Sequence, residues 1–235
     1  MVRKKILIVM AAGSGVRMGG PVPKQFLDLS GEMVLKRTIG LFVSAVPDLR
    51  VITVLPKDYV DFWKRSCLEG GVTYPQTLVP GGITRFHSVR NALAKVPDGA
   101  IVAIHDGVRP LISKSLIDKM FSMMDSGRCH ALIPVLPSVD TLVSLDKGGE
   151  GDLVDSGERV DRSRIYRVQT PQMFLSEDIK AAYSLPFETS FTDDASVARK
   201  KGIPLSFTEG ERYNLKLTSP EDMALAEMII SSRKK

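Results

Sequence analysis

The chain has 235 residues, a mass of 25.8 kDa, a formal charge of +5 and an isoelectric point near 9.2. Its hydrophobic and charged fractions, 43% and 25%, are those of an ordinary globular protein, and its length suits a single α/β domain spanning 1–235. The basic balance predicts an anionic partner, and phosphorylated small molecules are favoured over nucleic acid because the cations are spread and no nucleic-acid-binding motif is present.

The first predicted element is an apolar strand that leads into a glycine-rich loop. Residues 6–10 form an uninterrupted run rich in β-branched side chains, which is typical of a strand buried on both faces of a parallel sheet. The small residues 11–15 follow, where a backbone can approach a ligand closely and successive N–H groups can form a nest for anions. Arg17 and Lys24 add positive charge beside this loop. The combination predicts a polyphosphate site.

Several families place a glycine-rich turn after a first strand, and the details separate them. A Walker A loop is excluded because Lys24 lacks a preceding glycine and a following Ser or Thr. A Rossmann fingerprint is disfavoured because Met18 fills the third glycine position and no acidic residue follows the apolar run at 51–55. The remaining pattern, small-Gly-x-Gly-x-Arg-Met and then Pro23-Lys24, resembles nucleotidyltransferases that join a nucleoside monophosphate to a sugar phosphate.

Strand and helix patterns alternate from residue 6 to residue 136. Beyond the first strand, we expect strands at 51–55, 73–79, 100–104 and 131–136, and helices at 33–44, at 58–68, from residue 83 or 84, and after a cap at Ser113. This alternation, without repeats or a linker, predicts a Rossmann-like, doubly wound α/β fold with a mostly parallel sheet.

Two of the predicted connections carry candidate ligand contacts. Arg85 and Ser88 lie one turn apart near the start of the helix that follows Gly81-Gly82, so they can face one ligand at a helix end that favours anions. Asp106 follows the strand at 100–104, at the sheet edge where open α/β sheets bind ligands. It is a candidate for ribose or Mg²⁺ contact, or else merely caps the following turn. Arg109, in the same loop, is a candidate for substrate phosphate.

The segment at 137–162 breaks the alternation. We expect a strand at 141–145, a turn at 146–149 and a return strand at 153–154. A two-stranded hairpin is marginally stable alone in water, so this β-arm is predicted to pack on a second subunit.

The last part of the chain returns to the earlier pattern. We expect a helix at 176–185, a helix opened by Thr192-Asp193-Asp194, short closing strands at 205–207 and 215–217, and a final helix to residue 230, with Ser219 as its cap and Pro220 at its first position.

The cysteines and the N-terminus bear on location. Cys67 and Cys129 are isolated, without a CxxC pair or a histidine cluster, as is typical of thiols in a reducing compartment. Arg3-Lys4-Lys5 and the apolar run imitate a signal peptide, but the run is at the short limit, and cleavage would remove the strand that positions Arg17. No other stretch approaches transmembrane length. We therefore predict a cytoplasmic protein without a membrane partner.

Assembled along the chain, these segments closely resemble the 2-C-methyl-D-erythritol 4-phosphate cytidylyltransferases. The matching pieces, in family order, are AAGSGVRM at 11–18, PKQFL at 23–27, GGITRFHSV at 81–89, HDGVRP at 105–110, VDT at 139–141, VDRSR at 160–164, QTPQMF at 169–174, TDDAS at 192–196 and NLKLTSPEDMALAE at 214–227.

The resemblance implies a homodimeric enzyme that uses Mg²⁺ to transfer CMP from CTP to a methylerythritol phosphate in non-mevalonate isoprenoid synthesis. By the same match, Arg17 and Lys24 stabilise the transition state, Arg162 and Lys216 position the sugar phosphate, and Asp106 lies at the ribose and the metal. The predicted nucleotide-binding residues are Ala11, Ala12, Gly13, Gly15, Gly82, Arg85, Ser88 and Asp106. The predicted substrate-binding residues are Arg109, Thr141, Arg162, Thr170, Thr192 and Lys216.

Two positions depart from the family pattern. Ile83 stands where many relatives carry an acid, and Tyr213 stands where an Asp is common. Both changes could loosen contacts to the base or the acceptor. Ribitol 5-phosphate cytidylyltransferase, which shares the CTP machinery, is therefore an alternative, although Val160-Asp161-Arg162 favours methylerythritol phosphate.

Other classes of protein fit the sequence less well. A glycosyltransferase would need a DxD metal motif, which the Asp106 loop lacks. Neither a Ser-His-Asp arrangement nor the additional histidines of a metal phosphohydrolase are evident. A non-catalytic nucleotide-binding regulator is an alternative from another class, against which the presence of both Arg17 and Lys24 argues.

Overall fold

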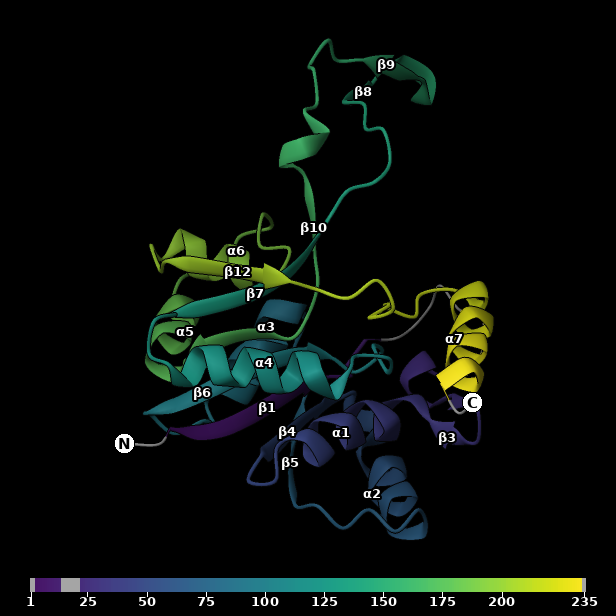
Figure 1. The fold of residues 1–235 in the computed structure, drawn as a ribbon, viewed down its shortest axis with the longest axis vertical. Coiled ribbons are helices and arrows are strands. Elements are labelled where there is room, and N and C mark those ends of the chain that lie inside the picture. Colours follow the sequence, from purple (N-terminus) through teal and green to yellow (C-terminus); the bar gives the residue numbers. More distant parts are fainter. Residues whose placement is uncertain (1–2, 14–21, 234–235) are drawn as a thin grey trace.

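The computed structural model describes residues 3–13 and 22–233, which form a mixed eight-stranded sheet covered by helices on both faces (Figure 1). The strand order is β10-β7-β11-β6-β1-β4-β5, with β12 paired to β7. These strands are β1 (Lys4–Met10), β4 (Arg50–Leu55), β5 (Gln76–Pro80), β6 (Ala100–Asp106), β7 (Ala131–Pro137), β10 (Tyr166–Val168), β11 (Gln172–Leu175) and β12 (Leu205–Glu209).

The sheet is parallel through the first half of the chain. Strands β6, β1, β4 and β5 run in one direction, whereas β11 is antiparallel to both β6 and β7. Strand β12 is parallel to β7. The prediction of a doubly wound, mostly parallel α/β fold is confirmed.

The helices divide between the two faces. They are α1 (Val34–Ala45), α2 (Val60–Glu69), α3 (Arg85–Leu93), α4 (Lys114–Asp125), α5 (Ser176–Tyr183), α6 (Asp194–Lys200) and α7 (Pro220–Arg233). Leu7 and Val9 of β1 pack with side chains of α1, α2 and α4. Ile6 and Ile8 pack with α3, α5 and α6 on the other face. The apolar run of β1 is therefore uninterrupted because both of its faces are buried.

The predicted helix caps are largely confirmed. Ser113 caps α4 by accepting a hydrogen bond from the Leu116 N–H, and the methionines of α4 lie in the core. Asp193 caps α6 in the same way through Ser196, and Pro220 is the first residue of α7. Within the described residues, no helix is both long and apolar enough to cross a membrane.

The segment predicted as an arm does extend away from the body of the molecule (Figure 1). Its hairpin consists of β8 (Leu145–Lys147) and β9 (Leu153–Asp155), whose residues are all exposed. The predicted strand at 141–145 was wrong, since β8 begins only at Leu145 and includes two residues that were assigned to the turn. The turn lies at 148–152 instead, where the glycines concentrate and Gly151 adopts a φ of 90°. These glycines shift the pairing toward the tip.

The predicted strand at 215–217 was also wrong, because these residues pair with no strand. Leu217 is buried against α7 in a cluster with Leu29, Val108 and Ala226. Its N–H donates to the Val108 carbonyl at 2.9 Å. The alternating pattern of this segment therefore reflects packing between the loop after β6 and the terminal helix. This placement brings Lys216 to the carboxyl end of β6.

Candidate active site

The loops that follow β1, β5 and β6 meet at one edge of the sheet. Met10 and Asp106 are register partners at the ends of β1 and β6. The Gly107 N–H donates to the Met10 carbonyl at 2.9 Å, and the Gly81 N–H donates to the Leu55 carbonyl at 2.8 Å. The first bond joins the loop after β6 to the end of β1, and the second joins the loop after β5 to the end of β4. All three loops thus lie at the carboxyl ends of parallel strands, where α/β sheets bind ligands.

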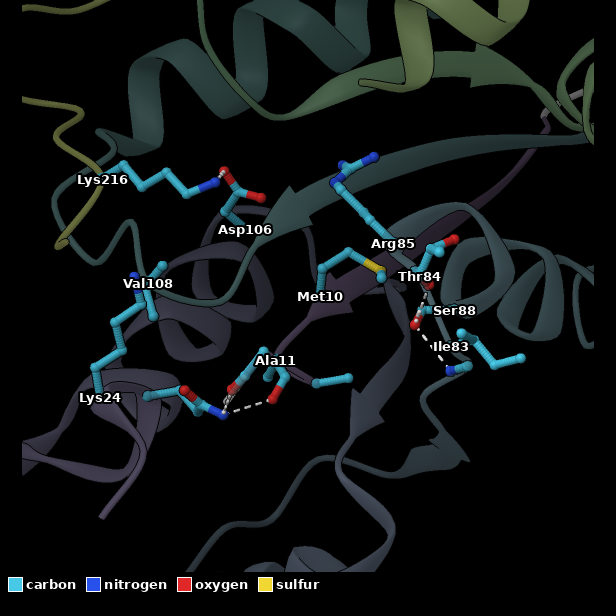
Figure 2. Close-up of a pocket in the computed structure, with 14 residues that line it drawn as sticks. Met10, Ala11, Lys24, Ile83, Thr84, Arg85, Ser88, Asp106, Val108 and Lys216 are labelled. Atoms are coloured by element: carbon cyan, nitrogen blue, oxygen red, sulfur yellow. Dashed lines mark hydrogen bonds and ion pairs between the residues drawn. The ribbon is translucent and has the colours of Figure 1, made fainter. Parts of the chain in front are cut away.

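A cavity of about 540 Å³ opens at this edge (Figure 2). It brings together nine predicted site residues: Ala11, Ala12, Gly13, Lys24, Gly82, Arg85, Ser88, Asp106 and Lys216. In the close-up, Lys24, Lys216 and Asp106 lie on one side of the cavity, and Ile83 and Ser88 lie on the other. Of the remaining predictions, Gly15 and Arg17 lie outside the described residues.

Close packing shapes the side of the cavity that is formed by the loops at 11–13 and 81–82. The side-chain amide of Gln25, which is buried, donates to the carbonyls of Ala11 at 2.7 Å and Gly13 at 3.0 Å. A Cβ on Gly81 would lie 2.5 Å from the Cβ of Ala12, and one on Gly82 would lie 2.9 Å from the His87 carbonyl carbon. Both glycines are thus required by close approach. Gln25 was missed because a lone glutamine gives no pattern in the sequence.

The hydroxyl of Ser88 organises the turn that precedes α3. It accepts a hydrogen bond from the Gly82 N–H at 2.9 Å and donates to the Thr84 carbonyl at 2.9 Å. Its single proton is therefore used within the chain, and only a lone pair is left for a ligand. Thr84 caps the helix by accepting from the His87 N–H.

Asp106 is the acidic centre of the cavity. Its Oδ2 lies 3.0 Å from Lys216 Nζ and 3.2 Å from Arg109 Nε. Burial alone would raise the pKa of this carboxyl, but the charges of Lys216, Arg85 and Arg109 hold it well below its ordinary value. Asp106 is therefore ionised near neutral pH, and it fixes two cations at the end of β6.

Arg109 and Thr170 contact Asp106 but do not line the cavity. Arg109 donates through NH1 to the Asn214 carbonyl at 2.8 Å. The Thr170 hydroxyl accepts from the Asp106 N–H at 3.1 Å and lies 3.0 Å from His105 Nδ1. Burial lowers the pKa of His105 to about 3, so this ring is neutral. Both predicted substrate contacts thus face the protein.

Asn214 ties the segment that carries Lys216 to this group. Its side chain is fully buried and donates to the Thr170 carbonyl at 2.9 Å. The Gln169 side chain donates to the Glu211 carbonyl at 2.8 Å and accepts from the Glu211 N–H at 3.0 Å. The position of Lys216 is consequently set by buried hydrogen bonds, which sequence patterns did not reveal.

Arg85, which also lines the cavity, pairs with a buried acid. Arg85 donates from NH1 and NH2 to the two oxygens of Asp194, at 2.7 and 2.6 Å. The Tyr183 hydroxyl donates to Asp194 Oδ1 at 2.5 Å. Burial alone would lower the pKa of Arg85, but Asp194 raises it above its ordinary value. Asp194 was predicted only as a first-turn helix residue. The predicted acceptor contact Thr192 is exposed beside it and does not line the cavity.

The two arm residues predicted to bind substrate do not line this cavity. Thr141 and Arg162 are exposed, and Arg162 donates from NH1 to the Val139 carbonyl at 3.2 Å. Both lie in the segment that projects from the body in Figure 1. Within one chain, the described residues bring most of the predicted nucleotide contacts together with Lys216 but not with Arg162.

Comparison with protein families agrees with this geometry. The sequence model of the 2-C-methyl-D-erythritol 4-phosphate cytidylyltransferases (IspD) matches residues 5–232. A protein of that name from Bacteroides fragilis is 40% identical over 223 residues, which cover 95% of this chain and 98% of the relative. One from Porphyromonas gingivalis is 40% identical over 233 residues, which cover 99% of this chain and the whole of the relative.

Solved structures give the same result. The 4-diphosphocytidyl-2C-methyl-D-erythritol synthase of Anaerococcus prevotii superposes with a TM-score of 0.79 at 27% identity, covering 97% of this chain and 99% of that one. The 2-C-methyl-D-erythritol 4-phosphate cytidylyltransferase of Thermus thermophilus superposes with a TM-score of 0.71 at 28% identity and the same coverage.

Proposed function

Since this chain belongs to the 2-C-methyl-D-erythritol 4-phosphate cytidylyltransferase family, we propose that the cavity beside Asp106 and Lys216 is where it transfers CMP from CTP to 2-C-methyl-D-erythritol 4-phosphate. Pyrophosphate leaves, and the product feeds non-mevalonate isoprenoid synthesis. The observation that carries the location is the meeting of Lys24, Lys216 and Asp106 with the small-residue loop at 11–13 in one cavity.

Electrostatics explains what the cations contribute to this reaction. The acceptor phosphate must attack the α-phosphorus of CTP, and both reactants are anions. Negative charge grows on the α-phosphoryl oxygens and on the departing pyrophosphate, so fixed cations aimed there stabilise the transition state more than the ground state. Lys24 takes this role, together with Arg17. No general base is needed, because the phosphate nucleophile is already ionised.

Lys216 belongs to the acceptor side. Its ammonium lies 3.0 Å from Asp106 Oδ2 and remains partly exposed to the cavity. It can therefore hold the acceptor phosphate near Lys24 without leaving Asp106. Arg109 and Thr170 keep Asp106 in place, and Thr192 precedes the start of α6, where Asp194 pairs with Arg85.

The Asp106 carboxylate fits a Mg²⁺ ion that is held mainly by its substrate. Among the described residues, no group of three or more acidic, histidine or cysteine side chains could hold a metal ion. Mg²⁺ is commonly bound by one or two carboxylates together with substrate phosphates and water, and Asp106 supplies one such carboxylate at the cavity. When bound, the ion would neutralise charge on the triphosphate and its leaving group. Asp106 would hold it.

The arm supports a homodimer. Its exposed apolar side chains include Val143, Leu153 and Val154, with exposed fractions of 69%, 68% and 51%. Several exposed apolar side chains on and beside a thin hairpin are typical of a protein–protein contact. In a symmetric pair each arm can pack on the other subunit and carry Thr141 and Arg162 to that subunit's cavity.

The cytoplasmic location of the protein remains a prediction from its sequence.

Pyrophosphate release tests the proposed function directly. Purified protein is given CTP and Mg²⁺ with either 2-C-methyl-D-erythritol 4-phosphate or ribitol 5-phosphate, and CTP is then replaced by UTP or ATP. Rapid release should require CTP and the methylerythritol acceptor. Faster release with ribitol 5-phosphate would change the assigned acceptor. Equal rates with UTP and CTP would contradict selection of the cytosine base, and Ile83, which departs from the family pattern, would be the first residue to test. No release with either acceptor would contradict enzymatic function.

A further inference from the structure

Asp194 is a buried acid that the chemistry proposed above does not use. Its side chain has no exposed surface, and it accepts from both terminal nitrogens of Arg85 and from the Tyr183 hydroxyl. Removing a charge from water is costly unless it is paired and hydrogen-bonded. Asp194 meets that requirement with Arg85 as its cationic partner, which makes Arg85 difficult to move.

The pair fixes the direction of the Arg85 guanidinium. A bidentate Arg–carboxylate contact uses two parallel hydrogen bonds and therefore sets the plane of the group as well as its position. The Arg85 side chain nevertheless remains 32% exposed and lines the cavity, whereas Asp194 is completely covered. The guanidinium thus stands at the boundary between core and cavity, with N–H groups left over for a ligand.

The Arg85 side chain extends away from the turn at Gly82. In Figure 2 its side chain runs from the start of α3, away from Ser88 and Ile83, to the level of Asp106. Its charge also helps to hold the pKa of Asp106 low, although Lys216 contributes more. Arg85 therefore joins Asp106 and Lys216 rather than the turn at Gly82, which shapes the nucleotide side.

Asp194 is itself held by its surroundings. The Gln172 side chain of β11 accepts from the Ala195 N–H and donates to Asp193, both at 2.7 Å. Tyr183 stacks on Phe86 of α3, with ring centroids 4.7 Å apart. The start of α6 is thereby fixed to both the sheet and α3. A rigid support of this kind is what a precisely aimed side chain needs.

We propose that Asp194 is a positioning residue that aims Arg85 at the acceptor phosphate, and that Tyr183 holds Asp194 in place. The proposal rests on the cytidylyltransferase function argued above. It adds Arg85 to Lys216 and Arg162 as a third cation on the acceptor side. A phosphate monoester presents several acceptor oxygens, which suit the remaining N–H groups of a guanidinium.

The test uses two neighbouring acids that differ in their contacts. Asp194→Asn keeps the shape of the side chain but removes the charge that holds Arg85. Asp193→Asn is the matched control, because Asp193 caps α6 and contacts Gln172 but makes no contact with Arg85. For each full-length variant, turnover, the KM for each substrate and the melting temperature are measured. Arg85→Lys and the double variant Asp194→Asn/Arg85→Lys complete a cycle.

We expect Asp194→Asn to lower kcat/KM for the methylerythritol acceptor about 10- to 100-fold while the KM for CTP changes less than about threefold. Asp193→Asn should leave both values within about threefold, since Asn is also a good helix cap. The double variant should be no worse than the more severe single variant, because Asp194 acts through Arg85. Tyr183→Phe should give a smaller loss of the same kind.

Other outcomes separate the possible failures. Additive losses in the double variant, equal losses for the two aspartates, or a loss confined to the KM for CTP would overturn the positioning role and leave the proposed function intact. A wild-type protein without cytidylyl transfer would overturn both. If Asp194→Asn fails to fold, Arg85→Lys and Tyr183→Phe still decide the matter, since normal acceptor kinetics in both would contradict the proposal.

Discussion

The cavity and the arm both carry predicted site residues, but the chain holds them in opposite ways. In the cavity, Asp106, Arg85 and Lys216 are each paired with a charged partner and are supported by buried hydrogen bonds. In the arm, Thr141 and Arg162 are exposed, and the hairpin beyond them is exposed throughout. The difference indicates that one chain assembles the predicted nucleotide contacts of the described cavity by itself, whereas the proposed role of the arm requires another surface.

The largest expected effect comes from removing a cation from either region. Lys24→Ala and Lys216→Ala should lower turnover about 100- to 1,000-fold, because each removes a fixed charge from the transition state or from the acceptor phosphate. Arg162→Ala should lower it comparably, although it does not line the described cavity. Pyrophosphate release gives the turnover, and calorimetry with CTP checks that the nucleotide still binds. Near-normal turnover in any variant would remove that residue from the site.

Mixing variants tests whether the arm acts on its own chain or on its partner. Lys24→Ala and Arg162→Ala subunits, each inactive alone, are combined and allowed to exchange. If the arm acts in trans, one site of each mixed dimer receives intact Lys24 from one chain and intact Arg162 from the other. Random exchange makes about half of the dimers mixed, so roughly a quarter of wild-type activity should return. If the arm serves its own chain, every site remains damaged and no activity returns.

The sequence predicted the cavity better than the arm, for a physical reason. Apolar runs predicted that β1 and β6 are strands of one parallel sheet, which the structure confirms. Because the carboxyl ends of such strands lie at one edge, Asp106 and the loop at 11–13 were expected to lie close together. The glycines at 81 and 82 likewise marked the break before the helix that carries Arg85 and Ser88. Local patterns were less reliable where packing decides, as at 215–217, where alternation reflected contact with α7 rather than a strand.

Contacts between distant residues left no local signal. Arg85 and Asp194 are 109 positions apart, and nothing in the pattern around Asp194 distinguishes it from its neighbour at the helix start. The side chains of Gln25 and Asn214 donate hydrogen bonds to backbone carbonyls. Many polar side chains can do so, and therefore the sequence does not single out these two residues. The resemblance to a family supplied Arg162 and the role of Arg17, and both roles remain predictions because Arg17 lies outside the described residues and Arg162 lies in the arm.

Acid should destabilise the cavity region but not the arm. Folded His105 has a pKa of about 3, below the ordinary value near 6.5, so the unfolded chain binds more protons between these values. Its contribution to stability is present above pH 6.5 and is lost as the pH falls toward 3, at up to about 1.4 kcal/mol per pH unit. Urea unfolding at several pH values, without nucleotide or metal, measures this slope.

Two variants assign the slope to a region. His105→Asn should flatten the dependence between pH 6.5 and 3, because it removes the group whose protonation differs between the two states. Asp161→Asn in the arm should change it far less: hydrogen bonds from Ser163 lower the pKa of Asp161, but this side chain is fully exposed and solvent screens the effect. An unchanged slope in His105→Asn would show that other groups dominate acid unfolding.

The smallest expected effect is on CTP binding when the tip of the arm is made polar. Leu153→Ser with Val154→Ser removes two exposed apolar side chains, 68% and 51% exposed, from a three-residue strand. Sedimentation should show a shift from dimer toward monomer, because both side chains are mostly exposed in the single chain and would be covered only by a partner. Exposed substitutions cost a folded chain little, within about 0.5 kcal/mol. Calorimetry should therefore give a CTP affinity within about twofold of wild type, while turnover falls with the dimer. A parallel loss of CTP affinity would mean that the nucleotide side also depends on the partner, and the contrast between the two regions would fail.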